Sequence, residues 1–197
     1  MDFYPDPIIF NGMFVSPALV FRPRLILRLV LVWIAVYLIP SYLQAQESGE
    51  QVQWYTWQEA SKLQQEKPKK LLLDMYTNWC GWCKKMDAST YRDKAVAKYL
   101  NEHFYAVKMD AETKDSLHFQ GKTYGFKPEY RSNELAAVLL NGQMSYPTTV
   151  FLDDKMNPIG PVPGYMDNRQ MLIVMRYFAE DLYKTKRWED YLQDELK

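Results

Sequence analysis

A pair of cysteines, Cys80 and Cys83, follows directly on a short apolar segment, and this arrangement constrains the fold more than any other feature. The segment, residues 71–76, reads LLLDMY, which is typical of a strand buried in a mostly parallel sheet. The residues from Lys84 to about Thr90 are typical of a helix. The sequence therefore predicts that the two cysteines lie where a buried strand passes into a helix.

The chemistry of a helix N-terminus gives the two cysteines different expected roles. Free backbone N–H groups and the positive end of the helix dipole stabilise a thiolate there, so we expect a lowered pKa for Cys80. Cys83 comes one turn later, and we expect it to be less exposed and to point back at Cys80. The pair would then cycle between dithiol and disulfide, with Cys80 as the attacking thiol and Cys83 as the resolving thiol.

Two other roles for the cysteine pair stay open at this point. A zinc site needs two further ligands, and the two histidines of the chain, His103 and His118, lie in segments that do not imply convergence on the cysteines. A purely structural disulfide would stabilise little, because closing so short a loop removes little entropy from the unfolded chain. We expect no bound metal.

Helices and strands alternate along the rest of the chain, which predicts an α/β fold. Helices are expected over residues 57–67, 93–101, 132–140, 167–184 and 188–196, and strands over residues 104–110, 148–152 and 159–162. The strand–helix–strand order at the start implies a right-handed parallel crossover. Together these segments predict a mixed sheet of about four strands flanked by helices.

The N-terminal part of the chain has the pattern of a targeting segment. An uninterrupted apolar run, residues 29–39, lies within residues 25–43 behind several arginines, and it is shorter than the ~20 apolar residues of a membrane span. We expect a signal peptide cleaved after Ala45, with an uncleaved signal anchor as the alternative. Residues 1–21 are interpreted as an over-extended start, and residues 46–53 as a polar linker.

This leader, residues 1–45, predicts an exported, periplasmic protein. The alternative is a protein anchored in the membrane by residues 25–43 and facing the periplasm. The 24 basic and 24 acidic residues cancel, so the charge gives no indication of nucleic-acid binding.

The residues around the cysteine pair resemble the thioredoxin superfamily. The matching segments are LLDMYTNWCGWCK, residues 72–84, and YPT, residues 146–148. The resemblance covers residues 54–184 and is strongest to exported bacterial thioredoxin-like proteins with an enlarged loop before the proline. It implies a thioredoxin-like three-layer sandwich with a helical insertion, residues 111–146, before the cis-proline strand and a C-terminal helical extension, residues 185–197.

The resemblance also implies roles for residues outside the cysteine motif. Pro147 corresponds to the cis-proline that faces the disulfide, and Tyr146 before it would present backbone groups to an extended partner chain. Asp74 corresponds to a buried acid with a raised pKa, which relays a proton to or from Cys83 through water, with Lys108 as its partner. A strand-start proline and a turn-capping aspartate are the simpler alternatives.

Four further residues are expected to contact substrate. Trp79 would shield the disulfide and offer an aromatic surface, or else pack in the core. Gly164 would let substrate approach the last strand, or else form a plain turn. Gly81 and Trp82 lie between the cysteines, and Trp82 replaces the proline of thioredoxins and the histidine of disulfide isomerases. Because a histidine there makes the pair more oxidising, its absence favours a reducing site.

The long insertion is expected to lie beside the redox site, because it leads directly into the proline turn. Its polar and aromatic side chains would then narrow the choice of partner: His118, Phe119, Tyr124, Phe126 and Tyr130. A second role is expected beside the first: the insertion packs a small extra helix onto the core.

These features together predict an exported thiol–disulfide oxidoreductase that reduces or isomerises protein disulfides and needs no bound cofactor. Its partners would be protein thiols and disulfides and a membrane electron donor. Two alternatives remain: a dedicated redox partner of a single client, as in cytochrome maturation, and a non-enzymatic binding module with an inert disulfide.

Overall fold

The computed structural model describes residues 51–195. The predicted leader and the first part of the predicted linker, residues 1–50, lie outside this range, as do residues 196–197 of the predicted extension. Among the helices within residues 51–195, none has the length and apolar character needed to cross a bilayer.

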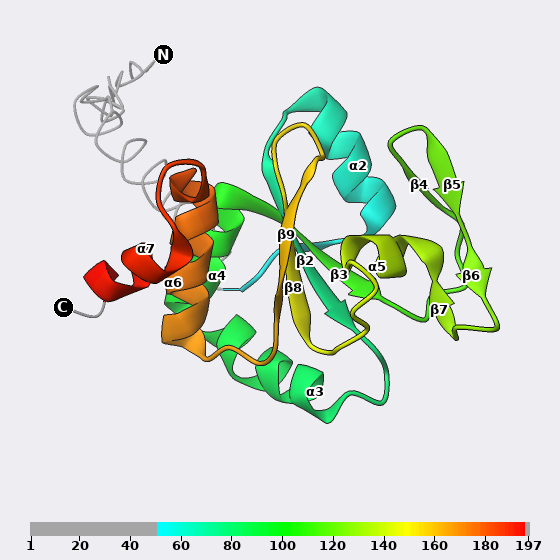
Figure 1. Cartoon of the computed structure of the whole chain (residues 1–197), viewed down its shortest axis with the longest axis horizontal. Helices are drawn as coiled ribbons and strands as arrows, with labels where there is room; N and C mark the ends of the chain where they lie inside the picture. Colours follow the sequence, from blue (N-terminus) through cyan, green and yellow to red (C-terminus); the bar gives the residue numbers. More distant parts are fainter. Residues whose placement is uncertain (1–50, 196–197) are drawn as a thin grey trace, which may run out of the picture. The chain divides into compact units, whose positions relative to one another are not determined.

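A five-stranded mixed sheet forms the centre of the domain (Figure 1). In spatial order the strands are β1 (Trp54–Tyr55), β3 (Phe104–Asp110), β2 (Lys70–Tyr76), β8 (Thr148–Leu152) and β9 (Pro158–Pro163). The first three run parallel, whereas β8 pairs antiparallel with β2 and with β9. Four of these strands are the expected ones. The fifth, β1, is an addition, because two residues give no readable periodicity.

Helices cover both faces of the sheet. They are α2 (Trp57–Glu66), α3 (Gly81–Ala88), α4 (Lys94–His103), α5 (Glu134–Leu139), α6 (Asn168–Ala179) and α7 (Trp188–Glu195), with the 3-10 helices η1 (Thr90–Arg92) and η2 (Leu182–Lys184). In Figure 1, α2 and α5 lie on one side of the sheet, and α4 and α6 lie on the other. This arrangement is the three-layer α/β sandwich that the resemblance implies.

The alternation of side chains along β2 divides the core into two clusters. Leu73 and Met75 pack with residues of α2 and α5, whereas Leu72 packs with Met86 of α3 and with residues of α4 and α6. Asp74 follows Leu72 by two residues and is buried. It therefore lies on the face of β2 that α3 covers.

The insertion before β8 contains more strand than the predicted helical insertion. Two small hairpins precede α5: β4 (Leu117–Phe119) with β5 (Lys122–Tyr124), and β6 (Phe126–Lys127) with β7 (Ser132–Asn133). Phe119 and Tyr124 are buried in the cluster on the α2 face, and the ring of Phe119 lies 5.7 Å from that of Trp57. For these two aromatic residues the prediction of partner contact is wrong, because they hold the insertion on the core.

The chain after β9 forms a long helix and a shorter one with a break between them. The helix expected over residues 167–184 ends at Ala179, because Asp181 has a φ of 59°, which a right-handed helix does not include. Helix α7 then packs on α6, where the ring of Tyr191 stacks 5.1 Å from that of Tyr177. The described part of the C-terminal segment is thus packed onto the domain.

A pair of substitutions tests whether α5 is part of the core. Leu139 is 1% exposed, whereas its neighbour Val138 is 48% exposed. We expect Leu139→Ala to lower the free energy of unfolding by ~2–5 kcal/mol, because the lost side chain leaves a cavity. We expect Val138→Ala to change it by less than ~0.5 kcal/mol. Chemical denaturation measures both values, and equal effects of the two substitutions would contradict the packing described.

Candidate redox site

Cys80 and Cys83 are joined by a disulfide at the N-terminus of α3, and their Cα atoms are 5.3 Å apart. Cys80 is the N-cap residue of this helix. Its Sγ accepts a hydrogen bond of 3.0 Å from the backbone N–H of Cys83. The predicted junction of strand and helix is therefore present, with β2 before the motif and α3 after it.

The N-cap position, and not exposure, distinguishes the two sulfurs. Cys80 and Cys83 are 4% and 3% exposed, so the expected difference in exposure is not found. The disulfide ties both residues into the same turn, which shields them alike. The hydrogen bond, by contrast, points from the helix to the Cys80 sulfur. In the dithiol form, the same N–H group and the helix dipole favour a thiolate at Cys80.

The peptide bond between Tyr146 and Pro147 is cis, as the resemblance implies. It directly precedes β8, which pairs with β2, the strand that leads to the cysteines. Gly164 lies beside it, because its N–H donates a hydrogen bond of 2.8 Å to the carbonyl oxygen of Pro147. Gly164 has a φ of 99°, a conformation that favours glycine, so this position serves both as a turn and as a neighbour of the proline.

The backbone of Tyr146 forms an unpaired edge. Within residues 51–195, no hydrogen bond uses its N–H or its carbonyl oxygen. Its ring packs edge-on against that of Trp79, with 5.9 Å between the centroids. An extended chain can pair with such an edge through main-chain hydrogen bonds, whatever its own side chains.

Trp79 lies on the surface, 66% exposed, which excludes the alternative of core packing. Its indole N–H donates a hydrogen bond of 3.1 Å to the carboxylate of Glu112. Trp79 and Tyr146 line a shallow pocket of about 420 Å³, together with Tyr130 and Met144 of the insertion. The latter two are 76% and 38% exposed. The insertion therefore reaches the redox site, as its place before the proline predicts.

Trp82 forms a second exposed aromatic surface beside the cysteines. It is 58% exposed, and its ring lies 5.5 Å from that of Tyr165. The ammonium of Lys85 lies 4.6 Å from the Trp82 ring centroid and 5.1 Å from that of Tyr165. Gly81 begins α3, and apart from its chain neighbours and the backbone of α3, a Cβ atom there would meet no atom within 4 Å. Tyr165 and Lys85 were not identified from the sequence, although the i,i+3 spacing of Trp82 and Lys85 was an available signal.

Asp74 is a buried acid, 1% exposed. Burial raises its pKa to about 6, while the ammonium of Lys108, 3.1 Å from Oδ2, acts in the opposite direction. Asp74 and Lys108 are opposite each other in the parallel register of β2 and β3. Among the described residues, Oδ1 of Asp74 has no hydrogen-bond partner. A carboxyl group that titrates near neutral pH can accept and donate protons there.

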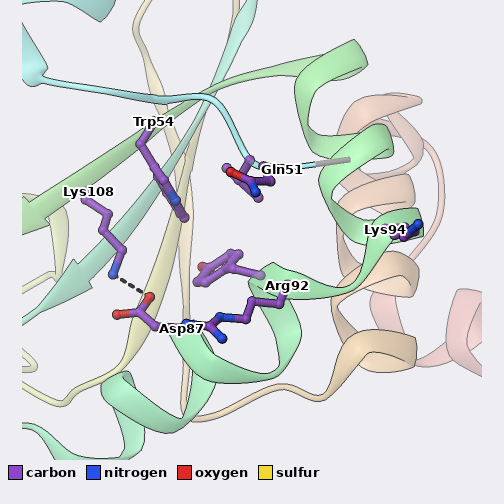
Figure 2. A pocket seen from close by; sticks show the side chains of 8 residues that line it. Gln51, Trp54, Asp87, Arg92, Lys94 and Lys108 are labelled. Carbon is purple, nitrogen blue, oxygen red and sulfur yellow. Dashed lines mark ion pairs between the residues drawn. The ribbon is translucent and has the colours of Figure 1, made fainter. Parts of the chain in front are cut away.

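Lys108 has a second carboxylate partner, Asp87, which was not identified from the sequence. The Lys108 Nζ lies 2.5 Å from Oδ1 of Asp87, which follows Cys83 by four residues on α3. Figure 2 shows this ion pair at a pocket of about 610 Å³. The pocket is lined by Gln51, Val52, Trp54, Asp87, Tyr91, Arg92, Lys94 and Lys108. The i,i+4 spacing of Cys83 and Asp87 could have indicated this residue, because it places both on the same face of α3.

The two histidines have partners other than the cysteines. His103 ends α4, and its ring lies 4.2 Å from that of Tyr99. His118 is in β4, and its Nδ1 lies 2.7 Å from the hydroxyl of Thr123. Across residues 51–195, no three His, Cys, Asp or Glu side chains gather as metal ligands would.

Comparison with known proteins identifies a family. The family Thioredox_DsbH, described as "Protein of unknown function, DUF255", matches residues 39–192, which is more than half of the chain. The uncharacterized protein B0495.5 of Caenorhabditis elegans is 30% identical over 131 residues, which are 64% of this chain and 16% of that protein. Spermatogenesis-associated protein 20 of Homo sapiens is 30% identical over 73 residues, 36% of this chain and 9% of that protein. The chain thus spans only a small part of the length of these relatives.

A solved structure supports the fold. A thioredoxin-fold protein from Helicobacter pylori matches with a TM-score of 0.50 and 25% sequence identity, over 64% of this chain and 80% of that chain. This likeness agrees with the mixed sheet and the helices on its two faces. The chain therefore belongs to the Thioredox_DsbH family, and residues 51–195 form a thioredoxin-like domain with a redox-type disulfide.

Proposed function

We propose that the protein is a thiol–disulfide oxidoreductase that reduces or isomerises disulfides of other proteins. One observation carries this proposal: the Cys80–Cys83 disulfide caps α3 close to the cis-proline turn, where the backbone of Tyr146 is unpaired. A disulfide with only a structural role would not require an unpaired backbone edge, such as that of Tyr146, beside it. Trp79, before Cys80, and Trp82, between the two cysteines, are exposed and supply apolar contact area for a partner chain.

The proposed reaction begins with the reduced pair. The Cys80 thiolate attacks one sulfur of a substrate disulfide, a mixed disulfide forms, and the other substrate sulfur leaves as a thiolate that takes up a proton. Cys83 then loses its proton and attacks the Cys80 sulfur, which releases the second substrate thiol. Two electrons pass to the substrate, and the Cys80–Cys83 disulfide remains. A dithiol on a membrane redox protein is the electron donor that we propose for its reduction.

The proton of Cys83 needs an acceptor inside the protein, because this residue is 3% exposed. Asp74 lies on the face of β2 that α3 covers, and its pKa of about 6 leaves it largely ionised at neutral pH. In the proposed cycle it accepts this proton through water when the mixed disulfide is resolved. Its pKa is closer to that of a thiol than an ordinary aspartate's, which makes it the stronger base.

The proposed location is outside the cytoplasm. The leader pattern of residues 1–45 supports export to the periplasm, either as a cleaved protein or with residues 25–43 as an anchor.

A dedicated redox partner of a single client is the second candidate. It is favoured by Tyr130 and Met144, which the insertion places beside the docking edge and which are exposed. An aromatic residue in such a position contributes most to binding a partner whose surface matches it.

Substitution of each cysteine tests the two-step mechanism. We expect Cys80→Ser to lose insulin disulfide reduction completely, because no attacking thiol remains. We expect Cys83→Ser to lose turnover as well but to accumulate mixed disulfides, which non-reducing gels and mass spectrometry detect. Lys98→Ala, on α4, is the control and should keep full turnover. Retained turnover in either cysteine variant would refute the mechanism.

Asp74→Asn tests the raised pKa of the buried acid. Asp74 has a folded-state pKa of about 6 and an unfolded value of ~3.9, so its contribution to stability is complete below pH ~4 and is lost as the pH rises through about 6. Relative to the parent, the free energy of unfolding of Asp74→Asn should therefore rise by on the order of 3 kcal/mol between pH ~4 and pH ~7. Denaturation of the oxidised proteins measures this difference. A difference that does not change with pH would rule out the raised pKa of Asp74.

Tyr130→Ala tests the contribution of the insertion to docking. We expect it to reduce kcat/KM for insulin about tenfold, because a large exposed aromatic contact is lost. The reaction with dithiothreitol, which has no protein surface to dock, should not change. Val138→Ala, another exposed apolar residue of the insertion, is the control. Equal losses for insulin and dithiothreitol would show that Tyr130 does not act through docking.

A further inference from the structure

The ammonium of Lys108 is shared by two carboxylates, and only one of them belongs to the proton site described above. It lies 3.1 Å from Oδ2 of Asp74 and 2.5 Å from Oδ1 of Asp87. The rings of Trp54 and Tyr76 also contact it, with centroids 5.4 Å and 4.9 Å away. These contacts from β1, β2 and α3 fix the position of the charge.

We propose that Asp87 is a positioning residue, which shares the Lys108 ammonium with Asp74 and so lets Asp74 hold its proton to higher pH than Lys108 alone would allow. The proposal rests on the proposed role of Asp74 as proton acceptor. A lysine bound to one carboxylate neutralises it. A lysine bound to two leaves a net negative charge when both acids are ionised, which opposes ionisation of one of them.

The difference in burial decides which acid takes up the proton. The side chain of Asp74 is 2% exposed, whereas that of Asp87 is 40% exposed and lines the pocket in Figure 2. A charge costs far more in the low-dielectric interior than beside water. As the pH falls, it is therefore Asp74 that takes up the proton first.

Within residues 51–195, four groups on neighbouring elements can influence the charge of Asp74. From the elements packed around it, Asp74 meets Lys108 of β3, Asp87 of α3, Tyr91 of η1 and Thr149 of β8. Burial raises the pKa of Tyr91 far above neutrality, and Thr149 does not titrate. Of these four, Lys108 and Asp87 are the groups that carry charge at neutral pH.

The position of Asp87 on α3 connects it to the cysteines. Asp87 follows Cys83 by one helical turn, so the helix that carries the resolving thiol also carries the group that adjusts the base for that thiol. The pKa of Asp74 then depends on the position of α3, which carries Asp87, relative to β3, which carries Lys108.

The test compares Asp87→Asn with Asp87→Glu and with Glu66→Gln. Glu66 is exposed at the end of α2, so its substitution changes the net charge equally without contact to Lys108. The readout is the NMR titration of the Asp74 carboxyl carbon in the oxidised protein, which needs no turnover. We expect a midpoint of about 6 in the parent and in Glu66→Gln. We expect it about one pH unit lower in Asp87→Asn, and closer to the parent value in Asp87→Glu.

A second readout is the pH dependence of mixed-disulfide resolution, whose acidic limb should move to lower pH by the same amount in Asp87→Asn. Circular dichroism checks that each variant folds, and Asp87→Ser replaces Asp87→Asn if that variant does not. An unchanged or raised Asp74 midpoint overturns the role of Asp87, even in a protein that reduces insulin. A lowered midpoint in a protein that fails to reduce insulin supports the role of Asp87 and refutes the proposed function instead.

Discussion

The position of β2 between a parallel and an antiparallel neighbour is the constraint on which the whole site depends. Its pairing with β3 sets Asp74 opposite Lys108, and its pairing with β8 sets Met75 opposite Thr148, the residue after the cis-proline. Five of the seven residues of β2 are buried, so its register is strongly specified. A slip of one residue would turn the buried acid away from α3 and separate it from the cysteines.

Elements with long apolar patterns were predictable, and short ones were not. The bounds of β2, β3 and β8 agree with the expected strands within one residue, because strands buried on both faces give a continuous apolar run. Strand β1 and the hairpins of the insertion are two or three residues long, and they form only because the folded domain offers them partners. Among the site residues, Cys80, Cys83 and Pro147 were predictable because their residue types have specific chemistry. Asp87 was not, because in the sequence it looks like any solvated charge on a helix, and only the fold brings Lys108 of β3 next to it.

The insertion combines two kinds of surface that its sequence alone does not separate. Phe119 and Tyr124 face inward and join the core, whereas Tyr130 and Met144 face outward beside the docking edge. All four are large apolar residues within one loop region, so composition gives no distinction. The difference follows from the two hairpins, which anchor one part of the insertion on the α2 face and leave the other part near Trp79.

The two faces of the sheet differ in their access to the cysteine pair. Tyr146 packs against the core cluster on the α2 and α5 face, whereas Lys108 and the pocket in Figure 2 lie on the face that α3 covers. In the proposed cycle, a docked protein covers the first side and leaves the second in contact with water. The protein substrate and the proton thus use separate routes. A proton taken up by Asp74 can pass to water while the substrate is still covalently attached to Cys80.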